Sequence, residues 1–263
     1  MAKTKLIAGL CVWTLAAMSP TAQAVPVEIT FTNNAPSAGT YLTPLFVGFH
    51  DGSYDAFNQG ETASTGLATL AEVGNPGILG DEFSAATVGG VRGVVGGGPV
   101  APGASFSIIL DLATDGSNSF FNFASMILPS SDFFIGNDDG FSIASVLGGS
   151  GPLTFDIVSA YDAGSEVNDF TTSAGNGLFS GIGLPASNAG EGVDENGVVT
   201  MVSSDAFGNF LNSGGVDLSG LGFDNYPSLA TITITAVPEP AGLTTLLLGF
   251  AGIGFVKRRK AAS

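Results

Sequence analysis

Cysteine, tryptophan, histidine and basic residues are scarce in this chain of 263 residues, and where they lie excludes several classes of protein. Cys11 and Trp13, the single residues of their kinds, both lie close to the N-terminus. A chain with one cysteine forms no internal disulfide and no zinc–thiolate site. Because His50 is the only imidazole, one chain cannot build a multi-histidine metal site, and a Ser-His-Asp triad would have to use this residue.

Positive charge is almost confined to the two ends of the chain. Two of the seven basic residues precede residue 6 and four form the cluster 257–260, which leaves Arg92 alone between them. The middle therefore carries 23 acids against one base, a formal charge of −22. Phosphate backbones and anionic lipids are bound through Lys and Arg, so this composition excludes nucleic-acid binding by the body of the protein.

The N-terminal segment has the order of a secretory signal peptide. Two lysines precede the apolar run 6–17, and Ala22 and Ala24 supply the small residues of a cleavage site. We expect residues 1–24 to be removed, so that the mature chain begins at Val25. An N-terminal membrane anchor is the alternative, but the apolar run is too short to span a bilayer.

The C-terminal segment 237–263 combines three features in a fixed order. Pro238, Glu239 and Pro240 precede the apolar run 241–256, and the basic cluster 257–260 follows. A helix of about 16 residues spans roughly 24 Å, so the run is a marginal transmembrane helix. Its basic end should remain cytoplasmic, which places the acidic body outside the membrane.

This tail resembles the PEP-CTERM sorting signal of Gram-negative bacteria. The resemblance implies that an exosortase-type membrane enzyme recognises the tail, which anchors the chain in the inner membrane before processing. It also implies a destination at the cell surface or in the exopolysaccharide of a biofilm matrix, with polysaccharide or matrix proteins as partners. The alternative is an ordinary C-terminal anchor.

The body, residues 25–236, is predicted to be an antiparallel β-sandwich. Period-two alternation of apolar and polar residues over 27–31 and 230–236 indicates two half-buried strands. The runs 106–112 and 153–160 are rich in β-forming residues and are bounded by turn formers. With 20 Phe in the chain, the core should be packed largely by phenylalanine.

Helices and loops take up the remaining body. One short helix is expected at 65–73, and Gly74 is placed to end it. The stretches 89–105 and 174–225 are rich in Gly, Ser and Asn and indicate long loops or irregular strands. We find no internal repeat.

Several motifs of the body occur in the order seen in a known extracellular module. The two most specific blocks are Ser125-Met126-Ile127-Leu128-Pro129-Ser130-Ser131-Asp132-Phe133 and Tyr161-Asp162-Ala163-Gly164. This order resembles the spondin N-terminal domain and covers most of residues 25–236. The resemblance implies a β-sandwich that acts in adhesion or matrix contact, that binds Ca²⁺ through acidic loop residues, and that has no known catalysis.

Carried over by motif, the metal ligands would be Asp132, Asp162 and Glu166. The chain departs from the family pattern at Ser131, where Pro is usual, at Phe133, where Trp is usual, and at Glu166, where Asp is usual. Glu in place of Asp keeps the charge and adds a methylene.

The residue chemistry independently favours a hard cation. Ca²⁺ takes six to eight oxygen ligands, which carboxylates and carbonyls at loop ends supply. Asp162 and Glu166 can converge if the loop folds back at Gly164, which tolerates a positive φ. The spacing differs from that of an EF-hand. The acidic runs 137–140 and 194–197 are better explained as turns.

Two hydrolytic functions are the alternatives. His50 lies beside Asp51, but no Gly-x-Ser-x-Gly elbow accompanies it, and the resemblance places a structural His there. A secreted glycan-active hydrolase with paired carboxylates stays open, because any two of 23 acids could lie ~5 to 9 Å apart. We therefore predict an exported, non-catalytic calcium-binding contact protein, with the hydrolase as the alternative.

Overall fold

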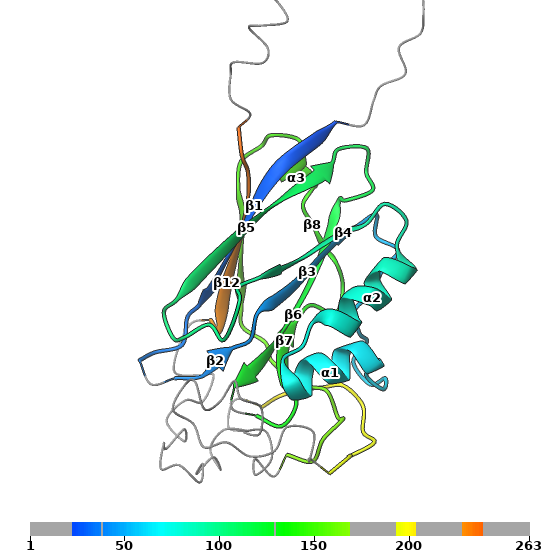
Figure 1. Ribbon diagram of the computed structural model, residues 1–263, viewed down its shortest axis with the longest axis vertical. Helices are drawn as coiled ribbons and strands as arrows, with labels where there is room; N and C mark the ends of the chain where they lie inside the picture. The colour runs from blue at the N-terminus through cyan, green and yellow to red at the C-terminus, as the bar shows by residue number, and fades with distance from the viewer. Residues whose placement is uncertain (1–22, 38, 129, 169–192, 204–227, 239–263) are drawn as a thin grey trace, which may run out of the picture.

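The protein is a sandwich of two antiparallel β-sheets, as the sequence predicts (Figure 1). The structure is a computed structural model that describes residues 23–37, 39–128, 130–168, 193–203 and 228–238. Residues 1–22 of the predicted signal peptide, most of the run 174–225 and the apolar run 241–256 lie outside these residues. None of the described helices is long and apolar enough to cross a membrane.

The smaller sheet has four strands in the order β5-β1-β12-β9. These are β5 (Ser105–Ala113), β1 (Ala24–Asn33), β12 (Ala230–Ala236) and β9 (Leu153–Ile157). In the register of β1 and β12, Ile29 pairs with Ile234 and Phe31 with Ile232, all four inward and buried. The alternating pattern therefore gave these strands correctly, and the first and last strands of the body are neighbours.

The larger sheet has eight strands, six of them in the order β11-β10-β7-β6-β3-β4. Its central members are β3 (Leu45–His50), β6 (Phe120–Leu128) and β7 (Phe133–Gly136), flanked by β4 (Val91–Val95), β10 (Tyr161–Asp162) and β11 (Thr200–Met201). Two short strands, β2 (Tyr41–Leu42) and β8 (Phe141–Ser142), also pair with β6. Strand β4 lies within the stretch 89–105, which the sequence indicated as a loop or irregular strand.

Phenylalanines fill the space between the sheets. The ring of Phe121 stacks on Phe49 at 5.1 Å and on Phe123 at 5.5 Å between centroids, and all three are fully buried. This cluster continues through Phe31 of the smaller sheet. The prediction of a phenylalanine-packed core is confirmed. Such aromatic pairs stabilise the interior of the sandwich.

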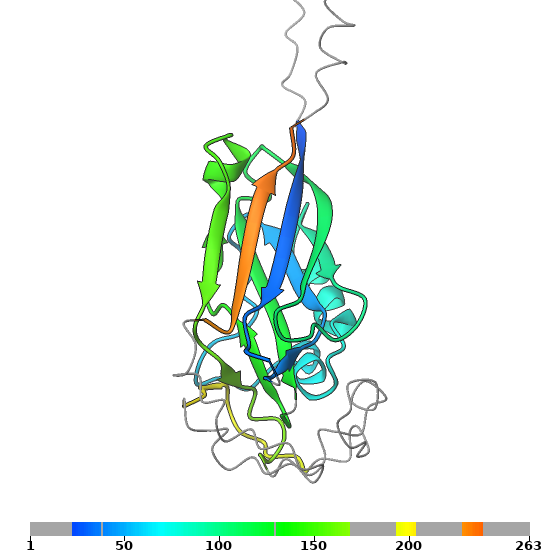
Figure 2. The ribbon, with the colours of Figure 1, turned by 90° about the vertical axis from the view of Figure 1, so that its left-hand side faces the viewer.

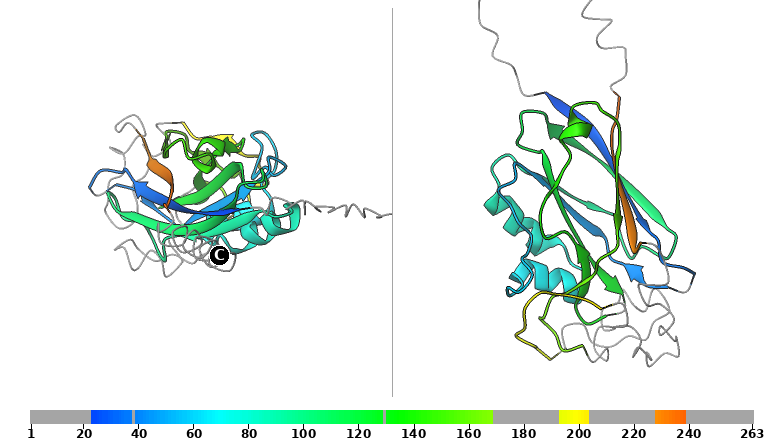
Figure 3. Two further views of the ribbon diagram at one scale, coloured as in Figure 1. Left: turned by 90° about the horizontal axis from the view of Figure 1, so that it is seen from above. Right: turned by 180° about the vertical axis from the view of Figure 1, so that it is seen from behind.

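Two helices form a third layer on the outer face of the larger sheet. They are α1 (Thr65–Val73) and α2 (Gly77–Ala86), and Figure 3 shows both beside this sheet. Their apolar side chains pack with those of β3 in a second core cluster. Because both faces of β3 are covered, all six of its residues are buried. A four-residue helix, α3 (Ala144–Leu147), lies elsewhere, against β12.

The predicted helix at 65–73 is confirmed, including both of its ends. Ser64 accepts a hydrogen bond from the Leu67 amide at 3.1 Å, and Gly74 ends the helix at φ 66°. The Glu82 carboxylate of α2 accepts hydrogen bonds from the Ser64 hydroxyl at 2.6 Å and from the Gly66 amide at 2.8 Å. Helix α2 was not predicted, and its carboxylate stabilises the start of α1.

The two ends of the described chain leave the sandwich at the same end (Figures 1 and 2). The far end of β1 is fixed by Asn33, whose side-chain Nδ2 donates to the carbonyls of Thr40 and Val100 at 2.9 Å. The next strand begins at Tyr41, which pairs with Leu128 at the end of β6. The turn after β6 therefore lies at the opposite end from the termini, about 30 Å away along the ten residues of β1.

Candidate metal centre

Asp132 lies in the tight turn that joins β6 to β7, where Ser130 shapes the backbone. The Ser130 hydroxyl donates to the Ile127 carbonyl at 2.6 Å and accepts from the Phe133 amide at 3.0 Å. Ser130, Ser131 and Asp132 are all 0% exposed. A carboxylate with no solvent contact must be neutralised by its surroundings, by a proton or by a cation.

The two oxygens of the Asp132 carboxylate have different environments. Oδ2 accepts three hydrogen bonds, from the Ser165 amide at 2.8 Å, the Ser165 hydroxyl at 3.2 Å and the Glu166 amide at 3.0 Å. Oδ1 is buried and accepts a hydrogen bond from none of the described residues. A buried acceptor without a donor costs free energy, so Oδ1 is the position where a ligand would have the greatest effect.

Asp162, the second predicted ligand, lies beside Asp132 because β10 pairs with β7. Asp162 is opposite Phe133 in that register, and the next residue, Ala163, donates its amide to the Asp132 carbonyl at 3.2 Å. The Asp162 carboxylate accepts hydrogen bonds from the Gly164 amide at 2.7 Å and from the Asn168 side chain at 2.6 Å. The loop therefore folds back at Gly164, whose φ is 64°, as the sequence predicted.

Glu166, the third predicted ligand, is 5% exposed and is held close to Asp132 through its backbone amide. Residues 164–167 pair with 193–197 as two short antiparallel segments, with Glu166 opposite Asp194. Among the described residues, however, no three Asp, Glu, His or Cys side chains form a group that could hold a metal ion. The full three-carboxylate ligand set therefore stays a prediction.

Neutral oxygens supply what the sequence reasoning missed. Apart from Asp132 Oδ1, the buried side-chain atoms of the described residues that lack a hydrogen-bond partner are Ser131 Oγ and Asn168 Oδ1. Ser131 is adjacent to Asp132 in the chain, and Asn168 contacts Asp162. Hydroxyl and amide oxygens are ordinary ligands of Ca²⁺ beside one or two carboxylates. The oxygen chemistry at this turn fits a hard cation.

The electrostatics point the same way. Burial raises the pKa of Asp132, the negative charge of Asp162 adds to the rise, and the hydrogen bonds from Glu166 and Ser165 only partly offset it, so that the pKa is about 7. Burial also raises the pKa of Glu72 on α1, and the negative charge of Asp194 adds to the rise while Ser165 opposes it. The one ion pair among the described residues of the body joins Arg92 of β4 to Asp81 of α2 at 2.9 Å. No described basic side chain is paired with these acids.

His50 has both ring nitrogens in hydrogen bonds that require its neutral form. Nε2 lies 2.6 Å from the Asn122 side-chain oxygen, and Nδ1 accepts from the amides of Gly52 at 3.0 Å and Tyr54 at 3.3 Å. Nε2 therefore carries the proton, and a second proton on Nδ1 would face two N–H donors. Burial lowers the pKa of His50, opposed by Asn122 and Asp51.

This geometry predicts acid sensitivity and a structural cost of removing the ring. His50→Ala should destabilise the fold by about 2–4 kcal/mol at pH 8, since it leaves a cavity and three unpaired polar groups. Because the folded-state pKa of His50 is below the ordinary 6.5, its contribution should be complete above pH 6.5 and lost as the pH falls below it. Urea unfolding at a series of pH values measures both effects.

Asp132 titrates in the same range with the opposite sign, so the His50 measurement needs a background without that group. In Asp132→Asn protein, adding His50→Gln should flatten the loss of stability below pH 6.5. An unchanged pH profile would show that His50 does not cause the acid sensitivity.

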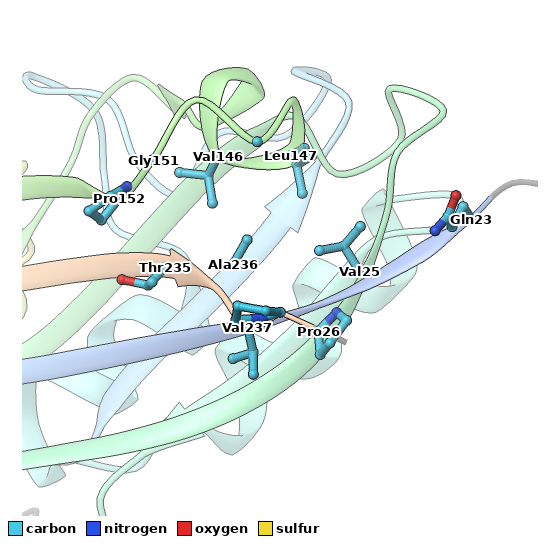
Figure 4. A pocket seen from close by; sticks show the side chains of 12 residues that line it. Gln23, Val25, Pro26, Val146, Leu147, Gly151, Pro152, Thr235, Ala236 and Val237 are labelled. Atoms are coloured by element: carbon cyan, nitrogen blue, oxygen red, sulfur yellow. The ribbon is translucent and has the colours of Figure 1, made fainter. Parts of the chain in front are cut away.

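Among the cavities that lie away from Asp132, two bear on function. The first, of about 430 Å³, is at the end where the termini leave and is lined mainly by apolar residues such as Val25, Leu147 and Val237 (Figure 4). None of its described lining residues is titratable, so it offers no acid–base chemistry. The second, of about 330 Å³, is lined by His50, Tyr54, Asp55 and Asp139 among others. Burial raises the pKa of Asp55, and Asp138 and Asp139 raise it further.

The fold and this turn define a β-sandwich module with a buried acidic centre at the end remote from its termini. Residues 22–171, more than half of the chain, match the family model described as Spondin_N, and the chain belongs to that family. No curated protein matches the chain. The family indicates an extracellular or adhesion-type protein and is not a known enzyme family. Strand β12 extends the sandwich beyond the matched residues.

Proposed function

We propose that this protein is an exported, non-catalytic contact protein of an extracellular matrix, and that its sandwich binds Ca²⁺ at Asp132. The observation that carries the calcium proposal is the fully buried Asp132 carboxylate, with three donors on Oδ2 and none from the described residues on Oδ1. A cation at Oδ1 would compensate both the unpaired acceptor and the buried charge.

The ligands of the ion would be Asp132, Asp162 and Glu166, with Ser131 and Asn168 as neutral oxygen donors. When bound, Ca²⁺ would supply charge compensation and cross-link the β6–β7 turn to the loop after β10. The chain itself already joins these segments, because Ser165 and Glu166 donate their amides to Asp132. The ion would therefore stabilise a loop surface at the end of the sandwich opposite the termini.

Calorimetric titration of the mature protein with Ca²⁺ tests this proposal. We expect one site per chain in the wild type and no heat of binding at that site in Asp132→Ala. The matched control is Asp156→Ala, which removes an exposed acid of the smaller sheet. If Asp132→Ala binds Ca²⁺ as the wild type does, the assignment to this turn is wrong.

We also propose that residues 237–263 are a sorting tail of the PEP-CTERM type, processed by an exosortase-like enzyme at a Gram-negative cell surface. The shared position of the two chain ends supports this, because one end of the sandwich can face the membrane while the Asp132 end points away. The Val237 amide still donates to the Pro26 carbonyl at 2.8 Å, so the sheet is complete before the Pro238-Glu239-Pro240 motif begins.

Ending the chain after Pro238 should convert a cell-associated protein into a soluble exported one, because it removes the apolar run and basic cluster that would hold it in the membrane. Immunoblots of membrane, envelope and medium fractions measure this. The matched control, Glu239→Gln, keeps the apolar run and should stay in the membrane fraction. Equal cell association of truncated and full-length protein would mean that the body is the anchor.

The alternative, a secreted glycan-active hydrolase, has its support at the cavity beside His50. Asp55, with its raised pKa, and Asp139 line that cavity together. Against it, both nitrogens of His50 are occupied by the fold, and the family is not a known enzyme family. Glycan hydrolysis that is abolished by Asp55→Asn would favour this alternative over the contact protein.

A further inference from the structure

The outer face of the four-stranded sheet is covered with hydroxyl side chains. Successive side chains of β1 and β12 alternate between the core and the outer face of the sheet. In β1, Val27, Ile29 and Phe31 point into the core, and the residues between them point outward. The outward residues of three neighbouring strands include seven with hydroxyl groups: Thr30, Thr32, Ser105, Ser107, Thr231, Thr233 and Thr235.

These hydroxyls form rows that run across the strands. One row places Ser107, Thr30 and Thr233 side by side, and the next places Ser105, Thr32 and Thr231 side by side. The pairs between β1 and β5 are hydrogen-bonded, with Thr30 to Ser107 at 3.1 Å and Thr32 to Ser105 at 2.7 Å. Thr154 of β9 extends the first row through Thr233 at 3.3 Å.

The rows have a regular repeat set by the sheet. Neighbouring strands are about 4.8 Å apart and successive outward residues of one strand about 6.8 Å apart. Each hydroxyl can donate once and accept twice, so the lateral bonds leave further hydrogen-bonding capacity facing outward. No described helix or loop crosses this face in the view that looks onto it (Figure 2).

Charge and polarity restrict what could bind here. The charged side chains on the described face are acidic, with Glu28, Asp111 and Asp156 around the hydroxyl rows. Arg92, the only base of the body, belongs to β4 of the other sheet and pairs with Asp81. Anionic polymers and anionic lipids would be repelled. Among the described residues, Ile109 is the only large apolar side chain exposed on the face, which is unlike the apolar and aromatic core of a protein–protein interface.

We infer that this hydroxyl face binds a neutral polysaccharide in an extended conformation. Such a chain carries hydroxyl donors and acceptors at regular intervals and no charge, which matches a surface of paired Ser and Thr hydroxyls in an acidic body. The inference rests on the proposed role in matrix contact and names the partner class and the surface. The face is made by different strands from the Asp132 turn, so the two sites can be tested separately.

Co-sedimentation of the full mature protein with three insoluble neutral polysaccharides, cellulose, chitin and curdlan, tests the inference. The informative variant is the pair Thr30→Val and Thr233→Val, which removes two adjacent hydroxyls and keeps shape and strand preference. We expect binding to at least one polysaccharide, weakened about tenfold or more in the double variant. The control Thr69→Val, which removes a hydroxyl on α1, should bind as the wild type does.

The remaining measurements keep each failure distinct. Melting temperature and its response to Ca²⁺ should be unchanged in the double variant, which shows that it folds and that the Asp132 site is intact. No binding of the wild type to any of the three polysaccharides would overturn the inference while a retained Ca²⁺ response left the proposed function standing. The inference would also be overturned if the double variant bound the polysaccharides as well as the wild type does. Two further results would overturn it: wild-type binding to the anionic polymer alginate, in chelator, as strong as to the neutral polysaccharides, or a double variant whose dimerisation changes while its polysaccharide binding does not.

Discussion

At pH 8 in the presence of a chelator, the Asp132→Asn variant should be at least as stable as the wild type, and Ca²⁺ should reverse that order. The wild type carries a fully buried carboxylate whose Oδ1 has no donor among the described residues, whereas the amide is uncharged. We expect the variant to be more stable in chelator by on the order of 1–2 kcal/mol. At a hundredfold excess of Ca²⁺ over Kd, the wild type should gain about 2.7 kcal/mol, a rise in melting temperature of roughly 5–10 °C.

The pH dependence in chelator follows from the same group. The pKa of Asp132 is about 7 in the folded protein and near 3.8 in the unfolded chain, so the folded state binds the proton more tightly. Its stabilising contribution is complete below pH 4 and is lost as the pH rises through 7. Ca²⁺ should therefore stabilise more at pH 8 than at pH 5, where the proton already neutralises the carboxylate.

General screening of a body with charge −22 would also raise the melting temperature, so the controls must separate the two effects. NaCl at matched ionic strength should shift the wild type and Asp132→Asn equally. Asp156→Asn, which removes an exposed charge, should keep the full Ca²⁺ response. A wild-type response to Ca²⁺ no larger than its response to matched NaCl would mean that no specific site exists.

The second large effect is expected at Gly164. Replacing it by alanine would place Cβ 2.6 Å from both the amide nitrogen and the carbonyl oxygen of Val198, and φ is already positive at 64°. Backbone atoms cannot move aside as a flexible side chain can, so the two paired segments must separate. We expect Gly164→Ala to cost about 3 kcal/mol or more and to weaken Ca²⁺ binding, because Ser165 and Glu166 follow directly.

Gly103→Ala is the matched control for this substitution. Its φ is 76°, close to that of Gly164, but nothing lies within 4 Å of the added carbon. It should cost only about 1 kcal/mol, the penalty of a left-handed alanine, and leave Ca²⁺ binding intact. Urea unfolding of both variants separates the contact from the backbone conformation, and equal losses would contradict the structural account of Gly164.

The strands of the smaller sheet could be predicted because one face of that sheet is in the core and the other in solvent. Apolar and polar residues alternate over 27–31 and 230–236 for this reason, and the same alternation exposes the threonines of the hydroxyl face. Strand β3 has no such signal, since the helices cover its second face and all its residues are buried. Helix α2 was missed because it contains Gly77 and Gly80 and has no side-chain cap at its start.

The candidate site could be predicted only in part. Asp132, Asp162 and Glu166 were indicated by their resemblance to a family motif, and Gly164 by its conformational freedom. Ser131 and Asn168 could not be recognised, because a hydroxyl or amide oxygen becomes significant only when it is buried without a partner. That property depends on how the β6–β7 turn packs against the loop after β10, which no local sequence pattern encodes.

Anomalous X-ray diffraction from crystals grown with Ca²⁺, compared with crystals grown in chelator, tests the central claim most directly because it locates the ion. The account predicts one peak per chain about 2.3–2.6 Å from Asp132 Oδ1. Other oxygen ligands should come from Asp162, Glu166, Ser131 or Asn168, and the peak should vanish in Asp132→Asn crystals. A peak at the Asp55, Asp138 and Asp139 group instead, or no peak at saturating Ca²⁺, would contradict it.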